Sequence, residues 1–234
     1  MDFQFYKVGK TVDLRRYIKY VLPHFVVKLY NDSHDFQIAQ KNKYFTDLTV
    51  REIYTLLAVL LDVEREVKNP LYLEIGVFKG GTLKFLKEHT RDVNFYGVDF
   101  FEDFIPEDGN THVCETFKTE AVKEYIGNGR VTLIKGDSAL VLPELKKSQT
   151  YFDMIFIDGN HTYEATRRDF ENSLVILKKG GYIAFHNASE SLAPDFMYVA
   201  NDGGPWKVTQ EIKRNRDFFF EAEVDRLRIF SYLR

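Results

Sequence analysis

The sequence predicts an α/β fold in which a mostly parallel β-sheet carries helices on both faces. From residue 71 onward, short apolar segments alternate with amphipathic ones, which is the pattern of repeated strand–helix units. The first apolar segment runs directly into a glycine-rich turn. The last two apolar segments are joined by only a few residues, and a link this short requires an antiparallel hairpin.

Composition narrows the classes of function. A chain of 234 residues with 44% hydrophobic residues fits one α/β domain with at most a small appendage. A net charge of −3 argues against general nucleic-acid binding, which leaves a basic footprint. The longest apolar run stops at Asp62 and is too short to cross a bilayer. The N-terminus has no long apolar stretch typical of a secretory signal, so we expect a cytoplasmic protein that binds no membrane.

The first 45 residues are rich in aromatic and charged residues and show no clear period. We expect residues 1–45 to form a lid or a dimerisation segment, the latter in a homodimer, and residues 46–234 to form the main domain. Thr49 and Glu52 have capping-box spacing and predict a helix that ends near Val67, before Pro70. Its apolar stripe includes Ile53 and Leu60.

Seven strands are expected. Five parallel strands cover residues 72–75, 94–98, 131–134, 154–157 and 182–185, and the C-terminal hairpin covers 217–221 and 226–233. Between the fourth and fifth strands, a helix is predicted from Tyr163 to about residue 177, with Gly180 and Gly181 as its exit turn.

The turn after the first strand reads Glu74-Ile75-Gly76-Val77-Phe78-Lys79-Gly80-Gly81-Thr82. A dinucleotide-binding turn would need glycine where Phe78 stands, and a P-loop would need lysine directly before Thr82. A glycine-rich turn also occurs as a plain connection between strand and helix. The spacing E-x-G-x-x-x-G-x-T resembles the first motif of class I methyltransferases that depend on S-adenosylmethionine (SAM).

Four further strands end in polar residues, at Asp99, Asp137, Asp158 and His186-Asn187. Ligands of open parallel sheets bind outside the carboxyl ends of the strands, so these residues and the glycine turn converge on one crevice. Ordinary loop or capping roles for Asp99 and Asp137 remain the alternative.

The segment Asp158-Gly-Asn-His161-Thr-Tyr-Glu164, together with Phe185-His186-Asn187, resembles a branch of class I methyltransferases found in natural-product and glycan biosynthesis. That branch typically shows Asp-Gly-x-His-x-Tyr-Glu and Phe-His-Asp, and the resemblance covers residues 46–234. It implies a SAM-dependent O-methyltransferase with a Rossmann-like seven-stranded sheet, acting on a hydroxyl of a sugar or another small molecule. It also implies the residues that bind the cofactor, which are Glu74, Gly76, Val77, Phe78, Gly80, Thr82, Asp99, Phe100, Asp137, Ser138 and Asp158.

The same resemblance implies the catalytic residues. His161 is the preferred base, because histidine titrates near neutral pH and a hydroxyl acceptor must lose its proton. Asp158 lies three residues before His161 and is expected to act with it. Glu164, three residues after His161, could orient the imidazole, or it could only stabilise the first turn of the following helix.

A divalent metal such as Mg²⁺ is left open. Members similar to catechol O-methyltransferases bind a cation at these strand ends, and Asp158, His186 and Asn187 could supply ligands here. Asn187 stands where aspartate is usual, and one carboxylate with neutral partners holds Mg²⁺ weakly, so a metal-free site driven by a base is equally viable. Two other functions stay possible, namely an iron- and 2-oxoglutarate-dependent hydroxylase using Asp158, His161 and His186, and a SAM-binding protein without catalysis.

Overall fold

The structure, a computed structural model, describes residues 44–101, 118–189 and 203–234. The predicted lid or dimerisation segment therefore lies outside the described residues, except for its last two positions. Within the described ranges the helices are α4 (Val50–Glu66), α5 (Gly81–His89), α6 (Thr119–Ile126), α7 (Ser138–Lys147), α8 (Tyr163–Leu174) and α9 (Gly204–Ile212). The strands are β1 (Leu71–Ile75), β2 (Asn94–Asp99), β3 (Val131–Lys135), β4 (Phe152–Ile157), β5 (Leu177–Phe185), β6 (Phe218–Val224) and β7 (Leu227–Tyr232).

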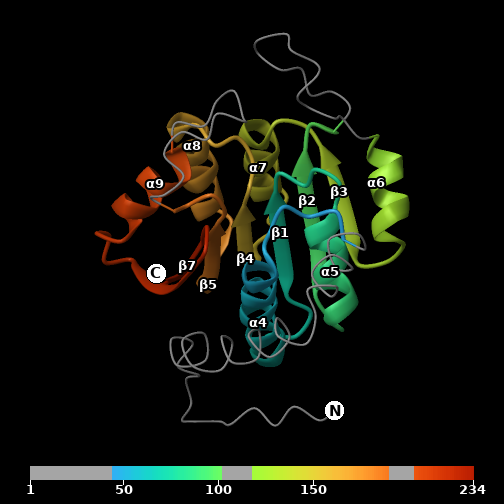
Figure 1. Ribbon diagram of the computed structural model, residues 1–234, viewed down its shortest axis with the longest axis horizontal. Helices are drawn as coiled ribbons and strands as arrows, with labels where there is room; N and C mark the ends of the chain where they lie inside the picture. Colours follow the sequence, from blue (N-terminus) through green and yellow to red (C-terminus); the bar gives the residue numbers. More distant parts are fainter. Residues whose placement is uncertain (1–43, 102–117, 190–202) are drawn as a thin grey trace.

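These strands form a seven-stranded sheet in the order β3-β2-β1-β4-β5-β7-β6 (Figure 1). The first five strands are parallel, and β7 pairs antiparallel with both β5 and β6. This confirms the predicted mostly parallel sheet with a C-terminal hairpin. Because β2 and β3 extend to one side of β1 and β4 lies on the other, strand order reverses between β1 and β4. Ligands of such sheets bind at this reversal.

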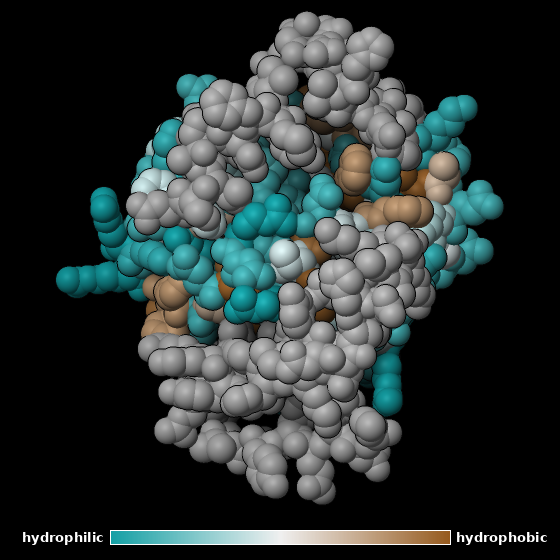
Figure 2. Space-filling model, viewed as in Figure 1, coloured by the Kyte–Doolittle hydropathy of each residue, from teal (hydrophilic) through white to brown (hydrophobic). Residues whose placement is uncertain are grey.

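Two apolar cores lie on opposite faces of the sheet. One joins buried side chains of α4, α5 and α6 to the sheet, and the other joins those of α7, α8 and α9, so the fold has three layers. Leu56 and Leu60 of α4 are fully buried, which contributes about 1.5–3 kcal/mol each. Most side chains visible on the face in Figure 2 are hydrophilic where the structure describes them.

Both predicted helix starts are confirmed. In the capping box of α4 the Glu52 backbone N–H donates to Thr49 Oγ1, and Glu52 Oε2 accepts from the Thr49 backbone N–H at 2.6 Å. At the start of α8, Thr162 Oγ1 accepts from the Ala165 N–H.

The predicted end of α8 is wrong. The helix ends at Leu174, and Gly180 and Gly181 lie inside β5 rather than in an exit turn. Leu177 already pairs with Phe152 of β4, and the pairing is irregular between Phe152 and Met154. The apolar spacing that extends α8 in the sequence therefore continues into a strand, because leucine and isoleucine suit both structures.

Candidate active site

The glycine turn and the end of β4 lie against each other at the reversal point. The Asp158 N–H donates to the Ile75 carbonyl at 2.8 Å, and the Gly76 N–H donates to the Val98 carbonyl at 2.9 Å. Gly76 has φ +87°, and a Cβ atom placed there would lie 2.1 Å from the Asp158 carbonyl oxygen. Glycine at position 76 is thus required by the approach of the chain itself, whatever ligand the turn also accommodates.

Gly80 has a similar role one turn later. It precedes α5 with φ +80°, and a Cβ atom there would lie 2.7 Å from Ile126 Cδ1 of α6. Thr82, in the first turn of the same helix, is buried, and its Oγ1 lies 2.9 Å from Thr46 Oγ1. The cofactor roles expected of Gly80 and Thr82 stay predictions.

Asp99 ties the end of β2 to the glycine turn. Its Oδ2 accepts the N–H groups of Val77 and Phe78 at 2.7 and 2.8 Å, and its Oδ1 accepts the Phe101 N–H at 3.0 Å. Each carboxylate oxygen has two acceptor sites, so Oδ1 keeps capacity for a further donor such as a ribose hydroxyl. The side chains of Phe78 and Phe100 are 46% and 40% exposed.

Glu74 is a buried acid at the end of β1. Only 2% of it is exposed, and its Oε2 accepts a hydrogen bond from the Tyr72 hydroxyl at 3.3 Å. Burial raises the pKa of Glu74 well above its usual value, and the negative charges of Asp158 and Asp99 raise it further. No described lysine or arginine forms an ion pair with it. Glu74 therefore lies where a cationic group would be favourable.

Asp158 contacts two histidines. His186 Nδ1 lies 2.9 Å from Asp158 Oδ1, and His161 Nε2 lies 3.5 Å from the same oxygen. Burial alone would raise the pKa of Asp158, but His186 and His161 outweigh it and hold the pKa well below the usual range. Asp158 is therefore a carboxylate at neutral pH.

His186 is enclosed between two acids. Its exposed fraction is 2%, its Nδ1 faces Asp158, and its Nε2 lies 3.4 Å from Glu52 Oε2. Burial lowers the pKa of His186, but the charge of Asp158, the hydrogen bond to it and the nearby Glu52 carboxylate outweigh burial and raise the pKa to about 9. For Glu52, burial raises the pKa, but His186 outweighs it and lowers the pKa to about 2.

Three of the described residues contact His161. Besides Asp158, the Asn187 side-chain nitrogen lies 3.1 Å from His161 Nδ1, and the His161 carbonyl accepts the Gly204 N–H of α9 at 3.1 Å. Asn187 has φ +50°, and its Oδ1 is buried without a hydrogen-bond partner among the described residues. Glu164 is exposed in the first turn of α8, so the orienting contacts of His161 come from Asp158 and Asn187.

Asp137 and Ser138 have structural partners at the start of α7. Asp137 Oδ1 accepts the Ala139 N–H at 2.9 Å, as an N-cap does, and the Ser138 hydroxyl donates to Asp169 Oδ1 at 2.5 Å. Asp169 is buried, which raises its pKa to about 6. The capping role is the alternative that the sequence left open for Asp137, and a contact with a cofactor remains a prediction.

Two site residues were missed from the sequence. Glu52 was recognised only as part of a capping box, although its position, four residues before Leu56 and eight before Leu60, places it on the apolar face of α4. Asp169 similarly lies on the buried face of α8. An acid on the buried face of a helix was the available signal, since such acids are rarely fully buried without a partner.

The described residues do not fit a divalent metal. They contain no group of three or more histidine, cysteine, aspartate or glutamate side chains arranged to hold one. His186 Nδ1 lies 2.9 Å from Asp158 Oδ1 and Nε2 is buried 3.4 Å from Glu52 Oε2, so both ring nitrogens already face acids of the protein. The same geometry disfavours the two-histidine iron site considered for a hydroxylase.

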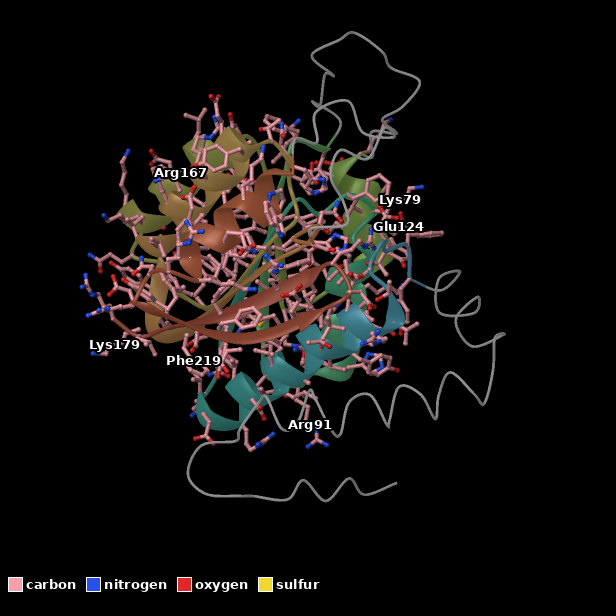
Figure 3. The ribbon with its side chains drawn as sticks, turned by 60° about the vertical axis from the view of Figure 1, so that its left-hand side comes forward. Lys79, Arg91, Glu124, Arg167, Lys179 and Phe219 are labelled. Atoms are coloured by element: carbon pink, nitrogen blue, oxygen red, sulfur yellow. The ribbon has the colours of Figure 1, made fainter. Side chains whose placement is uncertain are left out.

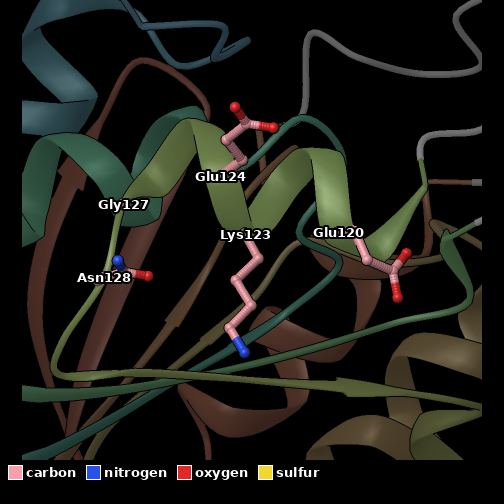
Figure 4. A pocket seen from close by; sticks show the side chains of 5 residues that line it. All are labelled: Glu120, Lys123, Glu124, Gly127 and Asn128. Carbon is pink, nitrogen blue, oxygen red and sulfur yellow. The ribbon is translucent and has the colours of Figure 1, made fainter.

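Two surface features of the described residues lie outside this group of acids and histidines. A depression that extends along α6 and the turn after it is lined by Glu120, Lys123, Glu124, Gly127 and Asn128 (Figure 4). None of its lining residues belongs to the group of acids at the reversal point. Arg167 projects from the outer surface of α8 (Figure 3), where it contacts Tyr163 and Glu211.

The sheet order, the reversal point and the polar strand ends define a class I methyltransferase fold. Solved structures agree. A Staphylococcus aureus protein assigned as a caffeoyl-CoA O-methyltransferase superposes with a TM-score of 0.62 at 14% identity, covering 91% of this chain and 98% of that one. MycE, from the mycinamycin biosynthetic pathway, was solved with Mg, S-adenosylhomocysteine (SAH) and mycinamycin VI. It superposes with a TM-score of 0.61 at 16% identity, covering 84% of this chain and 53% of MycE. The O-methyltransferase TomG from Streptomyces achromogenes was solved with SAM. It superposes with a TM-score of 0.56 at 18% sequence identity, covering 80% of this chain and 82% of TomG.

Sequence comparison adds the family. Residues 73–188 match a family model described as a methyltransferase domain. These residues are therefore a methyltransferase domain, and it contains Glu74, Asp99, Asp158, His161 and His186. An uncharacterised protein, R132 of Acanthamoeba polyphaga mimivirus, is 29% identical over 161 residues, which is 65% of this chain and 65% of the relative. None of the helices in the described ranges has the length and hydrophobicity needed to cross a membrane.

Proposed function

We propose that the protein transfers the methyl group of SAM to a hydroxyl of a small molecule, such as a sugar or a natural-product intermediate. The observation that carries the proposal is the group of acids at the reversal point of a methyltransferase domain. Glu74, Asp99 and Asp158 lie close enough there for the charges of the two aspartates to raise the pKa of Glu74. SAM, when bound, supplies a methyl group on a positively charged sulfur, together with an ammonium group.

The chain's own residues then bind and orient. Glu74, which has no described cationic partner, accepts hydrogen bonds from an ammonium group, and the remaining acceptor site of Asp99 Oδ1 takes a ribose hydroxyl. The Asp99 contacts to Val77 and Phe78 keep the glycine turn in place beside them.

His161 is the proposed base. A hydroxyl must lose its proton as its oxygen attacks a methyl group, and a histidine within hydrogen-bond reach takes that proton. Asp158 holds the proton of His161 Nε2 and stabilises the imidazolium that forms, which leaves Nδ1 as the basic nitrogen. Asn187 donates to Nδ1 in the resting site and must release it when an acceptor binds. MycE and TomG, whose complexes contain SAH and SAM, support the choice of cofactor.

The test separates binding from folding. Glu74→Gln keeps the size of the side chain and the Tyr72 hydrogen bond but cannot become negatively charged. We expect titration calorimetry to show SAM binding to the wild type and binding about 10- to 100-fold weaker to the variant, since hydrogen bonds to charged groups contribute about 1.5–3 kcal/mol. Stability should not fall, because the raised pKa shows that the charged acid is unfavourable in the free protein.

Asp62→Asn is the matched control. Burial also raises the pKa of Asp62, but this residue pairs with Arg65 on the surface of α4. Its SAM affinity should equal that of the wild type. If the wild type bound neither SAM nor SAH, the proposed function would be wrong. If it binds SAM, a screen of hydroxylated acceptors for SAH release identifies the substrate.

A further inference from the structure

Four side chains form a continuous row from helix α4 to the loop after β4. Glu52 Oε2 lies 3.4 Å from His186 Nε2, His186 Nδ1 lies 2.9 Å from Asp158 Oδ1, and that oxygen lies 3.5 Å from His161 Nε2. The row joins a helix that precedes the methyltransferase domain to its proposed base. Glu52 has no exposed surface, and its nearest polar group in the row is His186 Nε2.

The far end of the row is fixed. Glu52 Oε1 accepts the Arg226 backbone N–H at 2.7 Å, and its Oε2 accepts the Thr49 backbone N–H at 2.6 Å. The Arg226 guanidinium lies 3.4 Å from the same Oε2. Since each oxygen is already bonded, Glu52 cannot rotate away from His186, and the imidazole is fixed between two carboxylates.

We propose that Glu52 and His186 are positioning residues of the methyl-transfer site, and that the ion pairs of His186 with Glu52 and Asp158 take the place of a divalent cation at Asp158. The inference deepens the proposed function and rests on it. His186 Nδ1 hydrogen-bonds to Asp158, and Nε2 is buried 3.4 Å from Glu52 Oε2, so a protonated imidazole supplies Asp158 with a positive charge on one side. Asp158 then presents the same oxygen to His161.

The donor set explains why an ion is unnecessary. Mg²⁺ prefers several oxygen ligands, ideally carboxylates, but among the described residues near Asp158 the neighbouring strand end carries an imidazole and an amide. The Asn187 amide nitrogen is directed at His161, and the ring nitrogens of His186 are directed at acids. A buried charge needs a partner, and here the partner of Asp158 is part of the chain.

The first experiment uses metal ions alone. Purified full-length protein is treated with chelator and titrated with MgCl₂ and MnCl₂ while the melting temperature and the SAM affinity are followed. We expect both to stay constant up to millimolar metal. A metal-dependent rise in melting temperature that is lost in Asp158→Asn would overturn the proposal.

The second experiment tests Glu52 directly. Glu52→Gln keeps the capping box, which accepts glutamine as well as glutamate, but removes the charge beside His186. Two-bond ¹H–¹⁵N spectra of the histidine rings should show His186 doubly protonated at pH 7.5 in the wild type, and the titration of His186 should move to lower pH in the variant because one of its two acids is lost. His161 ring signals should shift with it, turnover should fall at least tenfold, and KM for SAM should change less than threefold.

Arg51→Gln is the matched control, since Arg51 precedes Glu52 on α4 and pairs with Asp225 on the surface. Its histidine spectra and turnover should match the wild type. Glu52→Asp should restore part of the wild-type spectrum. Unchanged His186 and His161 signals in Glu52→Gln would overturn the positioning role. Because metal titration and ring spectra need neither SAM nor an acceptor, a failure of SAM to bind refutes the proposed function separately.

Discussion

Replacing Gly76 by alanine should cost far more stability than its backbone conformation alone explains. Its φ of +87° is unfavourable for an L-residue by about 1–2 kcal/mol. The added Cβ atom would lie 2.1 Å from the Asp158 carbonyl oxygen, a backbone atom that cannot rotate away. Separating the two segments weakens the hydrogen bonds Gly76 N–H to Val98 and Asp158 N–H to Ile75, at about 1 kcal/mol each. The expected loss is about 3–4 kcal/mol.

Gly180→Ala separates the two contributions. Gly180 has φ +78°, close to that of Gly76, but no atom lies within 4 Å of an added Cβ. Urea denaturation should therefore show a loss of only about 1–2 kcal/mol for Gly180→Ala. Equal losses in the two variants would refute the close contact between the glycine turn and the end of β4. Gly76→Ala should also weaken SAM binding, because the segment that moves carries Asp158.

Two further predictions concern buried groups that titrate. The pKa of His186 is raised from 6.5 to about 9 in the folded protein. The protonated imidazole therefore adds about 3 kcal/mol to the free energy of unfolding below pH 6.5, and this stabilisation is lost as pH rises through 9. Urea midpoints should fall between pH 7 and 9.5, and in Glu52→Gln the fall should begin at lower pH. The pKa of Asp169 is raised to about 6, so its ionisation destabilises the fold above that pH. Asp169→Asn should be more stable than the wild type at pH 8 and should lose this advantage at pH 4. An advantage that did not change with pH would contradict the raised pKa.

Local signals in the sequence predicted local structure well. The capping box of Thr49 and Glu52 depends on residues three apart, so its geometry follows from a short segment. The alternation of strands and helices similarly predicted the sheet. The end of α8 failed because the apolar spacing that includes Leu177 suits a helix and a strand equally, and pairing with Phe152 decided between them.

The partners within the site could not be predicted in the same way. Arg226, in the turn between β6 and β7, is 174 positions from Glu52 in the sequence, and the folded sheet brings the two residues together. The sequence placed Asp99 at a strand end but not its bonds to the turn amides of Val77 and Phe78. His186 was one of the ligands considered for a metal that the sequence left open, and its position between Asp158 and Glu52 could not be read from the sequence. Such contacts depend on tertiary packing, which no spacing along the chain encodes.

The two groups of acids at the reversal point differ in how their charge is balanced, and this difference determines what the site can bind. Glu52 and Asp158 share the positive charge of His186, so they stay ionised without a ligand. Glu74 has only the Tyr72 hydroxyl as a hydrogen-bond partner among the described residues, so burial keeps it protonated until a cation arrives. Binding of a ligand with an ammonium group should therefore release a proton from Glu74. Calorimetry of SAM binding in buffers of different ionisation enthalpy measures that proton. Its release in the wild type but not in Glu74→Gln would identify Glu74 as the group that meets the cation, and equal release in both proteins would exclude it.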